Sequence, residues 1–168
     1  MAFQSFFFNI PRAVNFVFLV IVLGLSADLI ASQDHGNAKV NFALFTAIWG
    51  LLFSVFWGVI ANFIEFFSWP LLVAFFEITS AIFTLAAGAA LAAGLRAHSC
   101  TNQIYLDGNA ITQGSEHRCR EAQATTAFLF FSFAAFLVSS GLAAVAVLGS
   151  GLGGVRKSTP RTGVPTIA

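Results

Sequence analysis

Four long apolar segments constrain this chain more than any other feature of its sequence. They lie at about residues 13–31, 41–64, 70–94 and 122–148. A helix needs about 20 apolar residues to cross a hydrocarbon core about 30 Å thick. Each segment is long enough, so the sequence predicts an all-α membrane protein. We expect a four-helix transmembrane bundle over residues 1–149.

The composition agrees with this class and excludes others. Hydrophobic residues make up 58% of the chain and charged residues 9%, whereas soluble domains are about one quarter charged. The net charge of +1 argues against a nucleic-acid partner, which would require a strong basic excess. No internal repeat is visible, which disfavours an inverted-repeat transporter.

The N-terminal region allows more than one interpretation. Residues 1–12 are aromatic-rich and fit either a turn of helix on the membrane surface, ended by Pro11, or a disordered terminus. The first apolar span could also be a cleaved signal peptide, because small residues occur near Ser26. Against this, nothing basic precedes Arg12 and the apolar run exceeds a usual signal core.

The connections between the spans are mostly short. Residues 32–40 form a polar loop, and residues 65–69 form a tight join before Pro70, a favoured first residue of a helix. Residues 95–121 form the sizeable loop. The region 150–168 is rich in Gly and Pro, so we expect a flexible tail.

The cysteines suggest which way the bundle faces. Four spans put both termini on one side, but the basic residues divide four against four and leave the positive-inside rule undecided. Cys100 and Cys119 both lie in the 95–121 loop, which suggests a disulfide on the oxidising side. We therefore expect an extracellular loop and cytoplasmic termini. His98 and His117 leave a zinc site with both cysteines as an alternative, although the spacing matches no common zinc module.

Glu77 interrupts the third span, about 10 Å along the helix from Pro70. A charge at this depth costs a few kcal/mol, so the carboxylate should either take up a proton or face inward and find partners. Asn15 and Asn62 lie at matching depth, and an ion pair would require Arg12 to reach in from the first helix. Three roles fit: a structural hydrogen-bond network, a contact for a lipid headgroup or sterol hydroxyl, or part of a proton pathway.

The second span contains a stripe of small residues that continues to Asn62. Gly50, Ser54 and Gly58 are each four residues apart and therefore lie near one helix face. Such a face packs closely inside a bundle, or forms an oligomer seam or a lipid groove flanked by Trp49 and Trp57. The candidate packing or lipid-contact residues are Asn15, Gly50, Ser54, Gly58, Asn62 and Glu77.

The remaining motifs are weak. Ser158 and Thr159 precede Pro160 beside basic residues, and phosphorylation there would weaken an electrostatic contact with the membrane. No Ser/His/Asp arrangement, metal triad or nucleotide-binding loop occurs in the sequence. We therefore expect no enzymatic activity and no cofactor.

Four sequence blocks resemble a known family. They are ANFIEFFSWPLL at 61–72, AAGLRAHSC at 92–100, ITQGSEHRCREAQATTAFLFF at 111–131 and GVPTI at 163–167. The chain resembles the fungal non-classical export proteins, which are four-helix MARVEL-domain proteins of the plasma membrane.

This resemblance implies a non-enzymatic role in eisosomes, the furrow-shaped domains of the fungal plasma membrane. It implies a scaffold that organises the domain and responds to sphingolipid or sterol, with homo-oligomers and eisosome scaffold proteins as partners. The alternative is a factor or channel for signal-peptide-independent protein export. The absence of a polar stripe along any predicted helix counts against a channel.

Overall fold

The computed structural model describes residues 2–60, 69–96 and 98–150, and most of them are helical. Four segments are long and apolar enough to cross a membrane, and no strand occurs within the described ranges. This confirms the all-α membrane class. The elements are α1 (Ala2–Ala31), α2 (Ala38–Trp49), the π-helix η1 (Gly50–Phe56), α3 (Trp57–Ile60), α4 (Pro70–Leu95), α5 (Gln103–Gly108) and α6 (Glu116–Ser150).

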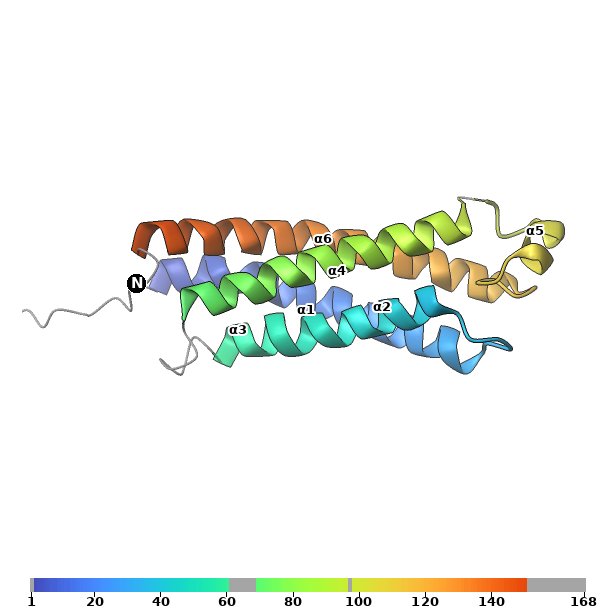
Figure 1. Ribbon diagram of the computed structural model, residues 1–168, viewed down its shortest axis with the longest axis horizontal. Coiled ribbons are helices and arrows are strands. Elements are labelled where there is room, and N and C mark those ends of the chain that lie inside the picture. The colour runs from blue at the N-terminus through green and yellow to red at the C-terminus, as the bar shows by residue number, and fades with distance from the viewer. Residues whose placement is uncertain (1, 61–68, 97, 151–168) are drawn as a thin grey trace, which may run out of the picture.

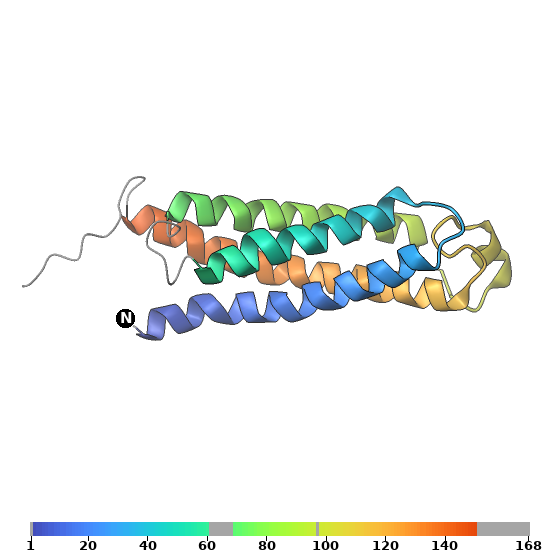
Figure 2. The ribbon, with the colours of Figure 1, turned by 90° about the horizontal axis from the view of Figure 1, so that it is seen from below.

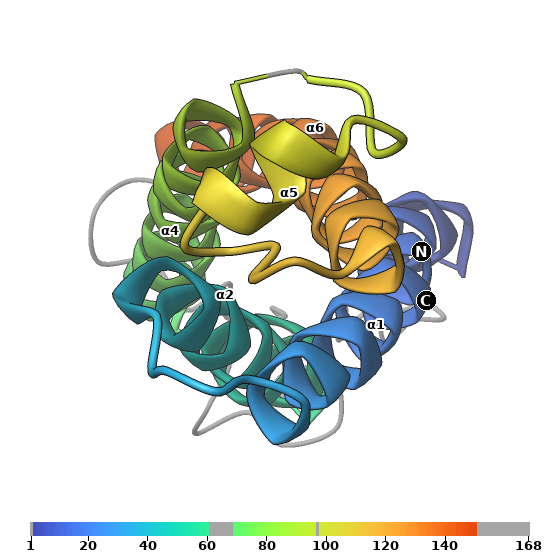
Figure 3. The same cartoon turned by 90° about the vertical axis from the view of Figure 1, so that its right-hand side faces the viewer.

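The long helices form an elongated bundle (Figures 1 and 2), in which α2, η1 and α3 continue as one rod. Seen end-on, the order around the bundle is α1, α2, α4, α6 (Figure 3). Neighbouring helices run antiparallel, as short connections require. Helices α1 and α4 therefore face each other diagonally. We call the end capped by α5 the loop end, and the end where α1 begins and α6 ends the terminal end.

The core changes character along the bundle. Near the loop end it is a layer of aliphatic and alanine side chains that includes Leu29, Val40, Leu91 and Leu129. A second apolar cluster follows toward the terminal end, where the fully buried Leu19 packs with Leu51 and Phe136. Beyond this cluster the buried side chains are largely polar. The apolar core thus gives way to a polar interior at the terminal end.

Local chemistry explains several helix ends. Asn37 precedes α2 and its side chain accepts a hydrogen bond from the Lys39 N–H, which caps the helix. Pro70 begins α4, as predicted from the sequence. Arg96 ends α4 in the left-handed conformation, with φ of 50°, a position that usually favours glycine.

Two predicted boundaries are wrong. Helix α1 passes through Pro11 instead of ending there, because membrane helices tolerate proline where local adjustments satisfy the freed carbonyl. Helix α6 begins at Glu116 instead of near 122, so the loop spans 96–115 and contains α5. The first turns of α6 are polar, but i,i+4 contacts of Glu116 with Arg120 and of His117 with Glu121 support them.

Candidate functional site

Glu77 pairs with Arg12 inside the bundle. Arg12 Nε donates a hydrogen bond to Glu77 Oε1 at 3.1 Å, and the two residues are 7% and 1% exposed. Arg12 lies on α1 and Glu77 on α4, so the ion pair joins diagonally opposite helices near the terminal end. The hypothesis that only the amide groups of Asn15 and Asn62 pair with the Glu77 carboxylate is therefore wrong. The span that contains Arg12 begins at Asn9, so its long side chain reaches the interior.

Gly58 makes room for this arginine. Arg12 Nη1 donates to the Gly58 carbonyl oxygen at 3.4 Å. A Cβ added at Gly58 would lie 2.5 Å from Arg12 Nε and 2.8 Å from Cζ. Because these distances are far below van der Waals contact, only glycine fits here while the guanidinium keeps its position. The α3 backbone therefore takes part in holding the ion pair.

The small-residue stripe faces the same interior. Gly50, Ser54 and Gly58 are all buried, and a Cβ at Gly50 would lie 2.7 Å from Leu19 Cδ1. In a regular α-helix a spacing of four residues drifts by about 40° per step. The wider turns of η1 rotate less per residue and offset this drift. The π-helix thus keeps the stripe on the interior face, where it packs within the bundle.

Several buried polar groups surround the ion pair. The hydroxyl groups of Ser54, Ser80 and Ser139, both amide atoms of Asn15 and Glu77 Oε2 lack a hydrogen-bond partner among the described residues. Ser54 faces the Glu77 carboxylate without ordinary hydrogen-bond geometry. The expected Asn15–Glu77 hydrogen bond is thus not formed, and Asn62 lies outside the described residues. The interior at this level can accept groups that form hydrogen bonds.

An aromatic layer closes the seam between the rod and α4. Phe76 of α4 has its ring centroid 5.2 Å from Phe53, 5.5 Å from Trp57 and 6.4 Å from Trp49. The two tryptophans lie on the same side, as predicted. Their rings fill the seam instead of flanking an open groove.

The loop end is fixed by covalent and polar contacts. Cys100 and Cys119 form the expected disulfide, with Cα atoms 5.7 Å apart. Because the bond uses both thiol groups, the alternative zinc site with His98 and His117 is wrong. Cys119 lies in α6, so the disulfide ties the loop to the start of that helix.

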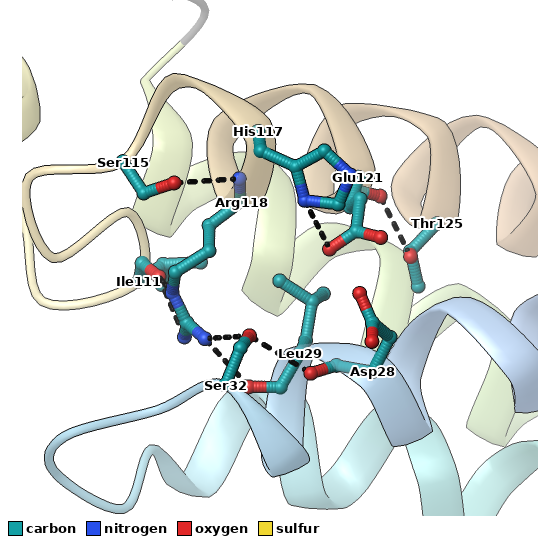
Figure 4. A network of polar contacts seen from close by, with 9 residues as sticks. All are labelled: Asp28, Leu29, Ser32, Ile111, Ser115, His117, Arg118, Glu121 and Thr125. Carbon is teal, nitrogen blue, oxygen red and sulfur yellow. Dashed lines mark hydrogen bonds and ion pairs between the residues drawn. The ribbon is translucent and has the colours of Figure 1, made fainter.

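The sequence identifies Arg118 only as one of the basic residues on the loop side, but the structure buries it, with 3% of its surface exposed. Its Nη1 donates to the Leu29 carbonyl oxygen at 2.7 Å and to Ser32 Oγ at 2.6 Å, and its Nε donates to the Ile111 carbonyl oxygen at 3.2 Å (Figure 4). Arg118 therefore satisfies the Leu29 carbonyl group near the C-terminal end of α1, where a cation is favourable, and the Ile111 carbonyl group of the loop. In the sequence, the one indication that Arg118 has a structural role is its position next to Cys119.

A three-residue group of possible metal ligands lies next to Arg118. Ligand atoms of Asp28, His117 and Glu121 all lie within 4.8 Å of one another, and His117 Nδ1 is 3.5 Å from Glu121 Oε2 (Figure 4). Carboxylate and imidazole donors suit a divalent cation. Asp28 and His117 are exposed.

The predicted phosphorylation sites, Ser158 and Thr159, lie outside the described residues, so they stay a prediction. The orientation of the termini also stays a prediction, because the bundle itself does not distinguish the two sides of a membrane.

Comparison with known proteins gives consistent matches over nearly the whole chain. "Non-classical export protein 2" of Saccharomyces cerevisiae is 44% identical over 165 residues, covering 95% of each chain. "Non-classical export protein 102" of Candida albicans is 51% identical over 161 residues, also 95% of each. A third relative, "Non-classical export protein 2 homolog 1" of Saccharomyces cerevisiae, is 39% identical over 166 residues with the same coverage. No solved structure matches the chain.

Residues 6–142 match the MARVEL family, described as a membrane-associating domain. This match includes all four spans up to Leu142 and the loop with its disulfide. The chain therefore belongs to the MARVEL family and, within it, to the non-classical export proteins.

Proposed function

We propose that this protein organises a lateral domain of the plasma membrane and responds to the lipids of that domain. The proposed domain is the eisosome, the lipids are sphingolipid and sterol, and the active form is a homo-oligomer that contacts eisosome scaffold proteins. The role is non-enzymatic. Binding of a lipid would shift the assembly only if the lipid prefers one of its states.

One observation carries this proposal: the spans keep the Arg12–Glu77 pair and the stripe of Gly50, Ser54 and Gly58 inside the bundle and present large apolar side chains to the membrane. Exposed large apolar residues occur on every span, for example Val17, Leu52, Ile82 and Phe131, each more than half exposed. Monomeric soluble proteins do not expose apolar surface on this scale. The outer surface is therefore the part that lipids and further copies of the chain would contact.

The second candidate is a factor or channel for protein export, favoured by the names of the relatives. The ion pair argues for the organiser. The ion pair joins diagonally opposite helices, and the side chains of Arg12 and Glu77 are almost inaccessible to water. A transport path would instead keep its ionisable groups in contact with water.

The test is reconstitution of the full chain in liposomes with and without sphingolipid and sterol. We expect energy transfer between labelled copies to change with lipid composition while encapsulated solutes are retained. Transport that is lost on Glu77→Gln would overturn the organiser in favour of the channel. Self-association that does not change with lipid composition would also overturn the organiser role.

A further inference from the structure

A pocket of about 460 Å³ opens at the loop end, between the start of α2 and the end of α4. This volume lies in the range of small-ligand sites. Lys39, Arg96 and His98 line it, and no Asp or Glu does. A pocket with two permanent cations, one imidazole and no carboxylate selects for an anion.

Two of the basic side chains form no ion pair or hydrogen bond with another residue in the part of the chain that the structure describes. The structure describes five basic side chains: Arg12 binds Glu77, Arg120 binds Glu116, and Arg118 binds carbonyl oxygens. Lys39 and Arg96 are the other two, and neither side chain has an ion pair or hydrogen bond to a described residue. Both line the same pocket. Their charges are therefore available to a ligand.

The wall formed by α5 and the following turn is held in place. Tyr105 Oη donates to the Leu95 carbonyl oxygen at 2.6 Å, and Asn109 Nδ2 donates to the Gly94 carbonyl oxygen at 2.8 Å. These bonds satisfy the last carbonyl groups of α4, so those groups do not compete for the cations. A Cβ at Gly94 would lie 2.4 Å from Ile111 Cδ1 and 3.1 Å from Lys39 Nζ, which places the ammonium group directly against α4.

The exposed face of α4 leads into this pocket. Exposed residues follow one another at intervals of three or four along the whole helix, which places them on a single stripe. They are Leu71, Phe75, Ile78, Ile82, Leu85, Ala89, Ala93 and Arg96. Ala93 and Arg96, the last two, also line the pocket. An acyl chain that lies along this stripe therefore places its headgroup at the cations.

We propose that the pocket binds the headgroup of an anionic, phosphate-bearing lipid whose acyl chain lies along the exposed face of α4. This inference deepens the proposed function and rests on it for the claim that lipid is the physiological ligand. Because the pocket has walls from α2, α4 and the α5 segment, a bound headgroup links three parts of the loop end.

The test is native mass spectrometry of the full chain after reconstitution with palmitoyl-oleoyl phosphatidylglycerol or the matching phosphatidylcholine. We expect preferential retention of phosphatidylglycerol. Lys39→Gln and Arg96→Gln should each lower that retention about fivefold, since one basic residue at a membrane surface contributes about 1 kcal/mol. Arg120→Gln is the matched control, because it removes one charge at the same end outside the pocket and should leave retention unchanged.

Three results would overturn the inference. The first is equal retention of the two lipids, and the second is an equal loss in Arg120→Gln, which would indicate unspecific charge attraction. The third is displacement of phosphatidylglycerol by millimolar inorganic phosphate, which would make the ligand a soluble anion.

The liposome assay separates this inference from the proposed function. Normal lipid-dependent assembly with retention unaffected by Lys39→Gln and Arg96→Gln would refute the pocket alone. Selective retention without lipid-dependent assembly would refute the organiser role alone.

Discussion

The buried ion pair makes the sharpest prediction about stability. Glu77→Gln removes one charge and leaves the Arg12 guanidinium at the centre of the bundle. Arginine keeps its charge in proteins, and breaking a buried pair in this way costs about 3–5 kcal/mol. The hydrogen bond of 3.1 Å and the exposed fractions of 7% and 1% put this pair in that class. We therefore expect strong destabilisation, whereas a neutral, hydrogen-bonded acid at this position would tolerate Glu77→Gln.

A double-mutant cycle isolates the pair. Arg12→Met with Glu77→Met replaces both charges by apolar groups of similar length, and such replacements are often neutral. The double variant should therefore unfold close to wild type, which gives a coupling energy of about 3 kcal/mol or more. The free energy of unfolding is measured by steric trapping in bicelles, and each variant is compared with wild type.

The control cycle uses Arg120 and Glu116, an exposed i,i+4 pair at the loop end. Its coupling should be about 0.3–0.5 kcal/mol, as for other exposed helical pairs. If the costs at Arg12 and Glu77 simply add, or if the two cycles give equal coupling, the interior pairing is wrong.

Three further predictions use the same unfolding assay. Gly58→Ala should cost about 1–3 kcal/mol because its Cβ displaces Arg12, and a cost that persists in Arg12→Met would contradict this cause. Reduction of the disulfide should cost about 3 kcal/mol, with Cys100→Ala and Cys119→Ala giving the same value, and thiol labelling without reductant would show that the bond is absent. Arg118→Met should cost about 2–4 kcal/mol because the Leu29 carbonyl group at the end of α1 and the Ile111 carbonyl group of the loop lose their donor, so a near-neutral result would refute the capping role.

Features that depend on long apolar runs can be predicted from the sequence, whereas contacts that depend on the position of a single side chain cannot. The four spans and the α4 start at Pro70 follow from composition and backbone chemistry. The Arg12–Glu77 pair was hard to find because Arg12 marked the apparent end of an apolar run. Its aliphatic arm lets the charge reach a depth that its Cα does not.

The two other failures have local causes. The start of α6 at Glu116 cannot be predicted from the apolar run alone, because the i,i+4 contacts of Glu116 and His117 stabilise polar turns before that run. The π-helical turns of η1 cannot be predicted from residue types, although the strict spacing of four in Gly50, Ser54 and Gly58 fits them better than it fits a straight α-helix. In both cases specific side-chain contacts and packing determine the helix, and the pattern of apolar residues does not reveal them.

The interior position of the small-residue stripe also constrains how copies of this protein could associate. Gly50, Ser54 and Gly58 contact Leu19 or Arg12, or lie beside Glu77, so close backbone contact between copies must use another surface. The remaining surface of the spans is apolar and is also the surface that lipid covers. Self-association and lipid binding would then compete for the same side chains. A lipid held by its headgroup at Lys39 and Arg96 would gain an advantage in that competition, which is how lipid composition could set the assembly state.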